Sequence, residues 1–367
     1  MTETRIFSDQ VITPTGQIAA ELVLRDGVIA AVEARASAPA GAIDWTGDVL
    51  IAGLIDIHTD NLEKHYQPRP GALWDAYGAA LAHEGQCVTA GITTVLDSLS
   101  LHGRKDGLDR KDALGPMIGG MDQAQLDGAL RADHLLHLRC EVTNPELLNL
   151  LEPHADNPRL KLLSVMDHTP GQRQTANVDR LQERMAAAGE LNGDPGVTYD
   201  NRRKVVAFAR EYGVPLAAHD DETLEHVEEA HDDGCVIAEF PVTLTAARRA
   251  RELGMFVAMG APNFVRGGSH SGNLSARESA QAGVLDILAS DYVPLSMLRS
   301  AFMLIDDLGW APQAAMATVS SAPARSLGLK DRGEIAAGQR ADLVRVSRRS
   351  QGWPVPVEVW RQGVRVA

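Results

Sequence analysis

The sequence has few cysteines, and their spacing excludes two common uses of this residue. The three cysteines lie far apart and form no Cys-x-x-Cys pair: Cys87, Cys140 and Cys235. A disulfide framework and a cysteine-rich zinc site are therefore excluded, and a reducing compartment is favoured. The first ten residues are polar and of mixed charge, which does not match a signal peptide. We therefore expect a cytoplasmic protein.

Long hydrophobic runs and an excess of positive charge are also missing. No apolar run approaches the roughly 20 residues of a membrane span, so we expect no membrane partner. The chain has 35 Lys and Arg against 49 Asp and Glu, a net charge of -14. A broad electrostatic surface for nucleic acid is therefore not expected. An anionic small molecule could still bind where a few basic groups, backbone amides or a metal ion meet.

Short β-like runs at the two ends predict one small β domain that is split in the sequence. Near the start, Asp26-Gly27 separates two apolar runs, which is a typical hairpin signal. Near the end, residues 341–346 and 355–360 have the same character. We predict a small β-sandwich domain formed by residues 1–50 together with 330–367.

Residues 51–329 alternate short apolar runs with helical patterns, which predicts an α/β fold. Eight strands are expected, near 54–58, 93–97, 134–141, 162–168, 215–219, 236–240, 256–260 and 286–291. Eight successive β/α units favour a (β/α)8 TIM-type barrel. A doubly wound open sheet is the alternative. It is disfavoured because no Gly-x-Gly-x-x-Gly follows the first strand and no Gly-x-x-x-x-Gly-Lys-Ser/Thr occurs.

The predicted strand ends carry side chains that bind metals. His58 and Asp60 follow the first strand and are two residues apart, so both point to one face. In a TIM-type barrel, the chemistry occurs at this end of the strands. Asp97 and Glu239 are weaker candidates, with supporting roles equally compatible. We predict a divalent metal site, one or two ions, with zinc first and manganese as an alternative. The predicted ligands are His58, Asp60, Glu141, His168, His219 and Asp291.

A glycine-rich stretch at residues 259–273 follows the predicted seventh strand. Its glycines let the backbone approach a ligand closely, and its arginine is suited to bidentate contact with phosphate. We therefore predict an anion-binding loop, joined by basic residues of other loops on the same face. The predicted substrate-binding residues are Lys64, Arg173, Asn263, Arg266, Gly267, Gly268, Ser269, His270 and Asn273.

Taken together, these features resemble the amidohydrolase superfamily. The resemblance includes a β domain built from both termini, a barrel, a His-x-Asp variant of the usual His-x-His on strand one, and an Asp on strand eight. Residues 333–344 are similar to the family's return segment. Five segments resemble a narrower branch, which acts in phosphonate metabolism beside the carbon–phosphorus lyase: 58–65, 166–172, 219–221, 239–241 and 260–273.

The narrower resemblance implies hydrolysis of α-D-ribose 1-methylphosphonate 5-triphosphate to the 5-phosphate and pyrophosphate. Asp291 is then expected to orient the attacking water and take its proton. A cyclic-amide hydrolase or deaminase of the same superfamily is the alternative enzyme, and a non-catalytic scaffold is the third reading. The arginine-bearing loop favours the triphosphate, because an uncharged cyclic amide would not need it. The oligomeric state stays open, with a homodimer as one option.

Overall fold

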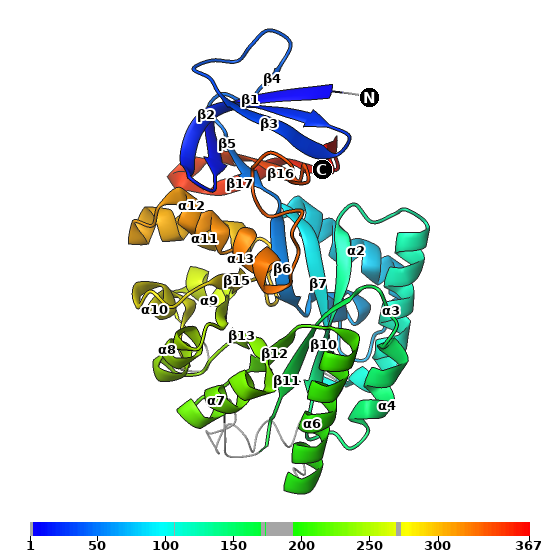
Figure 1. Ribbon diagram of the computed structural model, residues 1–367. Helices are drawn as coiled ribbons and strands as arrows, with labels where there is room; N and C mark the ends of the chain where they lie inside the picture. Colours follow the sequence, from blue (N-terminus) through cyan, green and yellow to red (C-terminus); the bar gives the residue numbers. More distant parts are fainter. Residues whose placement is uncertain (1–2, 106, 170–172, 174–193, 269–272) are drawn as a thin grey trace.

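The computed structural model describes residues 3–105, 107–169, 173, 194–268 and 273–367, and it shows a sheet stacked on the end of a barrel (Figure 1). Eight parallel strands form the barrel in the order β15-β14-β13-β12-β11-β10-β7-β6. Their bounds are β6 (Leu54–Thr59), β7 (Ile92–Ser100), β10 (Asp133–Glu141), β11 (Leu160–Met166), β12 (Leu216–His219), β13 (Cys235–Glu239), β14 (Phe256–Gly260) and β15 (Ile287–Ala289).

The eighth barrel strand meets the first at the last residue of β6 and just beyond the end of β15. A parallel bridge joins Thr59 to Asp291. The Asp60 N–H donates to the Asp291 carbonyl, and the Asp291 N–H donates to the His58 carbonyl, both at 2.9 Å. These bonds close the barrel, and the predicted TIM-type fold is confirmed.

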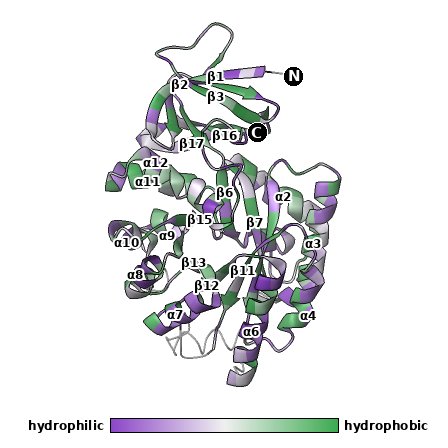
Figure 2. Cartoon of the chain, viewed as in Figure 1, coloured by the Kyte–Doolittle hydropathy of each residue, from purple (hydrophilic) through white to green (hydrophobic). Residues whose placement is uncertain are grey.

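Alternating side chains of the strands separate an inner apolar layer from an outer one. Ile57, Leu96 and Ile237 fill the barrel interior with other small apolar residues, while Val95 and Leu138 face the surrounding helices. Figure 2 shows the hydrophilic residues on the outer helices and the hydrophobic ones along the strands. The helices are α1 (Asn61–Tyr66), α2 (Ala76–Thr89), α3 (Arg110–Leu126), α4 (Leu147–Leu151), α6 (Pro195–Tyr212), α7 (Leu224–Asp233), α8 (Leu244–Glu252), α9 (Ala261–Arg266), α10 (Ala276–Gln281), α11 (Ser296–Leu308), α12 (Pro312–Ala317) and α13 (Ser321–Ser326).

Local sequence explains where a covering helix such as α7 begins and ends. The Thr223 side chain accepts a hydrogen bond from the His226 N–H and caps the first turn. Gly234 ends the helix with a φ of 89°, a left-handed conformation that glycine adopts without a steric penalty. Val227 and Ala230 are buried on the face that packs against the barrel. Capping and apolar spacing together fix this helix over its strand.

Both ends of the chain contribute to the second sheet. Its order is β18-β17-β16-β5-β1-β2-β3, and β4 (Ile43–Asp44) pairs with β1. The strands are β1 (Glu3–Thr13), β2 (Gly16–Arg25), β3 (Val28–Ala34), β5 (Val49–Ala52), β16 (Leu343–Arg348), β17 (Pro354–Arg361) and β18 (Val364–Arg365). The N-terminal part meets the C-terminal part where β5 pairs antiparallel with β16. The proposed division at residues 50 and 330 stays a prediction.

Asp133, at the start of β10, links this sheet to the barrel. Its carboxylate accepts from Arg332 at 2.6 Å and from Arg340 at 2.5 Å, and it also pairs with Arg361. Burial raises the pKa of Asp133, but Arg340 and Arg361 outweigh it, and the pKa is lowered.

No helix among the described residues is long and apolar enough to cross a membrane.

Candidate metal centre and active site

Three barrel strands end in residues with left-handed backbone. Asp220, Phe240 and Asp291 follow β12, β13 and β15 directly or nearly so, with φ of 62°, 57° and 54°. Such a φ is uncommon outside glycine, above all for a bulky residue such as phenylalanine, and it costs roughly 1–3 kcal/mol. The chain therefore bends sharply at the barrel mouth, and this bend brings strand-end side chains toward the barrel axis.

His58, Asp60 and Asp291 meet at the closing seam of the barrel. One ligand atom of each lies within 4.8 Å of the others, and the His58 Nε2 is 4.0 Å from the Asp60 Oδ1. His58 is buried, whereas Asp60 and Asp291 are partly exposed. Burial and the negative charge of Asp60 raise the pKa of Asp291. The structure thus brings three of the six predicted ligands together.

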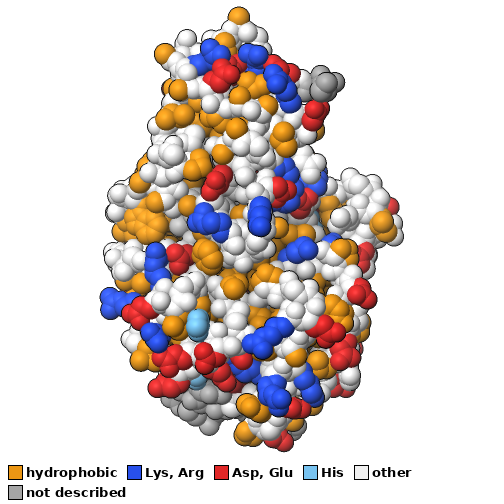
Figure 3. All heavy atoms as spheres, in the orientation of Figure 1, with side chains coloured by type: hydrophobic (Ala, Val, Ile, Leu, Met, Phe, Trp, Pro, Cys, Tyr) orange, Lys and Arg blue, Asp and Glu red, His pale blue; other side chains and the backbone are white. Residues whose placement is uncertain are grey.

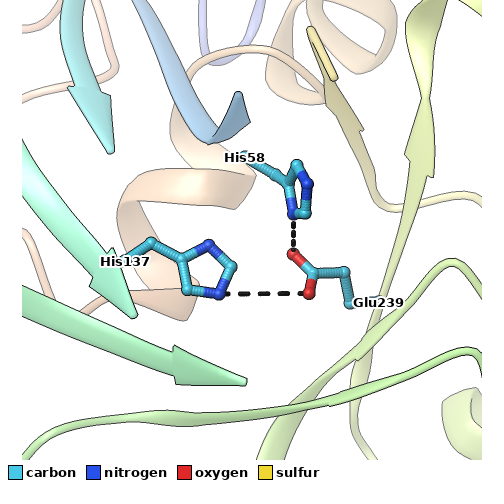
Figure 4. A group of neighbouring side chains, drawn as sticks. All are labelled: His58, His137 and Glu239. Carbon is cyan, nitrogen blue, oxygen red and sulfur yellow. Dashed lines mark hydrogen bonds and ion pairs between the residues drawn. The ribbon is translucent and has the colours of Figure 1, made fainter. Parts of the chain in front are cut away.

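Glu239 lies at the centre of the same region, although the sequence analysis predicted only a weak role for it. Its Oε1 is 2.7 Å from the His58 Nδ1. Its Oε2 lies 4.0 Å from the His137 Nε2 and 3.9 Å from the His219 Nε2 (Figure 4 draws the contacts with His58 and His137). Burial alone would raise the pKa of Glu239, but His58 and His137 outweigh it and keep the pKa well below its usual range.

The other predicted ligands form the adjoining side of the mouth. The His168 Nδ1 is 2.5 Å from the Glu141 Oε2, and its Nε2 is 3.8 Å from the Asp220 Oδ2. The same oxygen is 2.8 Å from the His219 Nδ1. Burial lowers the pKa of His168, but the negative charges of Glu141 and Asp220 raise it to about 10. All six predicted ligands therefore border one region, which we call the mouth cluster together with His137, Asp220 and Glu239.

Four buried polar atoms of the mouth cluster form no bond with hydrogen-bond geometry among the described residues: Nδ1 and Nε2 of His219, Oδ2 of Asp220 and Oε2 of Glu239. The His219 Nδ1 and the Asp220 Oδ2 lie 2.8 Å apart, but as a charge pair without that geometry. Burying an unsatisfied polar atom costs roughly 1–3 kcal/mol, so a group of them calls for an occupant. Imidazole and carboxylate are the ligand types that zinc and manganese accept. The residues present therefore fit a divalent cation.

Sequence reasoning missed His137, the inward-facing histidine of β10. It is buried beneath the mouth, with its Nε2 2.9 Å from the Ser164 Oγ and its Nδ1 3.0 Å from the Ile57 carbonyl. Burial lowers the pKa of His137 to about 3. A usable signal was present, because a residue four before Glu141 on the same strand faces the same side.

Asp97 does not lie at the mouth, where the sequence had placed it. The strand β7 continues to Ser100, and Asp97 points outward to α2. There the His83 Nε2 is 2.7 Å from the Asp97 Oδ1, and the His134 Nδ1 is 3.1 Å from the Asp97 Oδ2. All three side chains are fully buried, and we call them the outer cluster.

The glycine-rich stretch begins as a helix, which the loop prediction did not include. Pro262 stands in the first turn of α9, and Gly267 ends it with a φ of 82°. A Cβ on Gly260 would lie 3.5 Å from the Asp291 Oδ2 and 3.7 Å from the Asn263 Nδ2, so both side chains flank this glycine. Arg266 and Gly267 are exposed, and Gly268 and Asn273 are half-buried. Ser269 and His270 lie outside the described residues.

The two further predicted basic residues already contact the protein, and Lys64 lies in the helix α1 and not on a loop as predicted. Arg173 is buried and pairs with Asp221. The Lys64 Nζ donates to the Tyr292 carbonyl at 2.6 Å. Lys64 also lines a cavity of about 310 Å³, with Glu63, Gln67, Pro68, Arg69, Pro70 and Leu108. Of the two, Lys64 is therefore the one beside open space.

One face of the molecule shows how charge is distributed around this end. In Figure 3, acidic side chains gather over the lower part of the view, and basic ones are scattered among them. No broad basic field covers this face. Recognition of an anion therefore depends on groups inside the mouth and on the residues that rim it.

Comparison with known proteins defines the class. The amidohydrolase family model matches residues 49–366, and the chain therefore belongs to the amidohydrolase family. The alpha-D-ribose 1-methylphosphonate 5-triphosphate diphosphatase of Escherichia coli (strain K12) is 43% identical over 365 residues, which span 95% of this chain and 96% of that protein. The family prediction made from the sequence is confirmed.

Solved structures agree with the fold. The N-acetyl-D-glucosamine-6-phosphate deacetylase from Mycobacterium smegmatis has a TM-score of 0.67 at 16% identity, covering 99% of this chain and 100% of that one. The N-isopropylammelide isopropylaminohydrolase from Burkholderia multivorans ATCC 17616 has a TM-score of 0.67 at 18% identity, covering 99% and 98%. At such identities the likeness establishes the architecture alone.

Proposed function

We propose that this protein hydrolyses α-D-ribose 1-methylphosphonate 5-triphosphate to the 5-phosphate and pyrophosphate, as a step of phosphonate catabolism. The observation that carries the proposal is the 43% identity, across nearly the whole of both chains, to a diphosphatase of this substrate. The mouth cluster supports it, because it combines a divalent-metal donor set with a carboxylate suited to proton transfer. A cytoplasmic location and a homodimer are further expectations.

One or two divalent ions, zinc first and manganese as the alternative, would bind among the six predicted ligands. Glu239 contacts His58 and lies close to His219, so we add it to this donor set. When bound, a divalent ion polarises a phosphoryl oxygen and lowers the pKa of a water molecule toward neutrality.

Asp291 is the proposed general base. The buried position and the charge of Asp60 raise the pKa of Asp291, which strengthens it as a proton acceptor. Asp291 takes the proton of a water molecule as the water oxygen forms a bond to the α-phosphorus. The bond from the α-phosphorus to the α,β-bridging oxygen breaks, and pyrophosphate leaves with that electron pair. The other product is the 5-phosphate.

The residues after β14 are proposed to bind the phosphate chain. Asn263 lies beside Gly260 and Asp291, close to the proposed reaction centre. Arg266, Gly267, Gly268 and Asn273 follow on the rim, and Ser269 and His270 belong to the same proposed set. Backbone amides and an arginine are the usual partners of phosphate oxygens. Lys64, in α1, and Arg173 are proposed to contribute from other segments.

Phosphorus NMR tests the proposal directly. The purified chain, reconstituted with zinc or with manganese, is incubated with ribose 1-methylphosphonate 5-triphosphate. Pyrophosphate and the 5-phosphate, appearing in equal amounts, are the expected products. Orthophosphate instead of pyrophosphate would place the attack at the γ-phosphorus. No turnover with either metal would contradict the proposal and favour the cyclic-amide hydrolase or deaminase, to be tested with a cyclic-amide panel.

A further inference from the structure

The strand β10 carries an arginine between two residues of the mouth cluster. Leu138 and Cys140 belong to the outer apolar layer, so the residues between and beside them face the barrel interior. His137 confirms this direction through its inward contacts to Ser164 and Ile57. Arg139 therefore lies two residues after His137 and two residues before Glu141 on the inward face of β10, at the level of the mouth.

The surroundings of Arg139 are acidic. Burial lowers the pKa of Arg139, but the charges of Asp60 and Glu239, followed by Glu63 and Asp291, outweigh it and raise the pKa. In return, its positive charge opposes the rise in the pKa of Asp291 that burial and Asp60 cause. The acidic residues of the mouth therefore favour a charged guanidinium on this strand.

Arg139 differs from the buried arginines Arg173, Arg202 and Arg340 in its partners. Arg173 pairs directly with Asp221, Arg202 with Asp233, and Arg340 with Asp342. Arg139 forms no ion pair among the described residues, and its buried Nε has no hydrogen-bond partner there. A guanidinium that served only to balance charge would be expected to form an ion pair, because an unpaired buried donor is costly. The guanidinium of Arg139 is therefore available to something that enters the mouth.

The chemistry of that occupant follows from the group itself. Guanidinium is planar and always charged, and its paired donors match two oxygens of a phosphate. Phosphoryl transfer spreads negative charge over the equatorial oxygens, which a fixed arginine stabilises. Arg139 is partly exposed, as an arginine that meets a ligand must be. Its place on β10, between His137 and Glu141, is at the end of the barrel where Asp291 is the proposed base.

We propose that Arg139 is a catalytic residue that binds the α-phosphoryl oxygens of the triphosphate during its hydrolysis. This inference rests on the proposed function. The described rim residues Asn263, Arg266, Gly267, Gly268 and Asn273 are left to bind the β- and γ-phosphates, which leave as pyrophosphate.

The test compares Arg139→Ala and Arg139→Lys with Arg159→Ala. Arg159 is also buried, but it precedes β11 at the opposite end of the barrel and pairs with Asp122. Turnover of the triphosphate by Arg139→Ala should fall about 100-fold or more, the usual loss when one transition-state donor is removed. Arg139→Lys keeps the charge without the bidentate geometry and should stay at least about 10-fold below the parent. Arg159→Ala should turn over normally once folded.

Chemical rescue separates catalysis from a structural role. Added guanidinium chloride, at concentrations far below those that unfold the protein, should restore part of the Arg139→Ala activity and none of the Arg139→Lys activity. Turnover within about threefold of the parent in Arg139→Ala would overturn the proposal. So would a loss that guanidinium does not rescue and that matches a loss of folded protein.

A second measurement keeps the inference separate from the proposed function. Binding of inorganic pyrophosphate and inorganic phosphate to the metal-loaded chain is measured by calorimetry. If the parent chain does not cleave the triphosphate, the proposed function fails. The role of Arg139 is then tested by phosphate binding alone. Equal affinity for phosphate in the parent and in Arg139→Ala would overturn the inference. An affinity that is about 10-fold or more weaker in Arg139→Ala would support Arg139 as an anion-binding residue.

Discussion

The mouth cluster and the outer cluster use the same residue types on two faces of the same barrel wall, with opposite results. In the outer cluster, Asp97 accepts from His83 and His134 at 2.7 and 3.1 Å, and the Asn61 Nδ2 lies 3.2 Å from the second ring nitrogen of His83. Only the Nε2 of His134 is without a partner among the described residues. In the mouth cluster, several neighbouring groups are 3.8–4.0 Å apart, and four buried atoms make no bond with hydrogen-bond geometry among the described residues.

The difference shows that donor type alone does not define a metal site. Histidine protons directed at a carboxylate satisfy both partners, so the outer cluster has little to gain from an ion. The mouth cluster has carboxylates and imidazoles in excess of their mutual bonds. We therefore assign the outer cluster to structure, where it ties α2 and Asn61 to the barrel wall, and the mouth cluster to chemistry.

Among the tests that separate the two clusters, removal of metal is expected to have the largest effect on turnover. Dialysis against a chelator should reduce turnover of the triphosphate to background, and zinc or manganese should restore it. In metal analysis, His58→Ala should bind less metal per chain than the parent, whereas His83→Ala should bind the same amount. Equal loss of metal in the folded His83→Ala variant would show that the outer cluster is also a metal site.

Loss of the proposed base comes next. Asp291→Ala should lower turnover by about 1000-fold, within the range for a general acid or base. Because the side chain is partly exposed and its loss relieves repulsion with Asp60, the free energy of unfolding should hardly change. Steady-state kinetics and urea unfolding measure both quantities. Near-normal turnover would remove Asp291 from the mechanism.

The reverse pattern is expected for Asp97→Asn in the outer cluster. Removing one charge from a buried pair leaves the histidines uncompensated and should lower the free energy of unfolding by about 3 kcal/mol. Turnover per folded molecule should stay within about threefold of the parent. A folded Asp97→Asn variant that is as stable as the parent but inactive would reverse the two assignments.

The smallest expected effect is a dependence of the free energy of unfolding on pH. Burial raises the pKa of Asp97, but His134 and His83 outweigh it and hold the pKa well below its usual range. A lowered pKa contributes stability that is fully present above the unfolded value of about 3.9 and lost as the pH falls toward the folded value. The stability gap between parent and Asp97→Asn should therefore narrow below about pH 4, as urea unfolding across pH can measure. A stability difference that widens below about pH 4 would contradict the pairing of Asp97 with His83 and His134.

The barrel could be predicted closely from the sequence because its strands are short runs rich in apolar residues, separated by helical patterns. The strand β14 matches its predicted bounds, and the others agree within a few residues. His58 and Asp60 were found because alternation fixes their common direction. The six predicted ligands lie together in the structure, and their role in metal binding stays a prediction.

Where the sequence analysis misjudged a residue's position, the cause is a contact between distant parts of the chain. Because Ser98 and Ser100 are polar, the apolar pattern of β7 stops early, and Asp97 was predicted to end the strand. Ser98 is tolerated there because its hydroxyl meets the His137 ring at 3.0 Å. The central position of Glu239 depends on His58, 181 residues away, and no local pattern reveals such a pair.

The pairing of β5 with β16 has a consequence for how the chain is made. Ile51 is joined in register to Val344, so β5 is synthesised long before its partner strand β16. All eight barrel strands are synthesised in the interval. Non-local pairing of this kind forms late and slowly, because a long loop must close first. The apolar face of β1, β2 and β5 is thus exposed during synthesis, when it is open to chaperones and to mispairing. A stop codon before residue 343 would leave that face uncovered permanently.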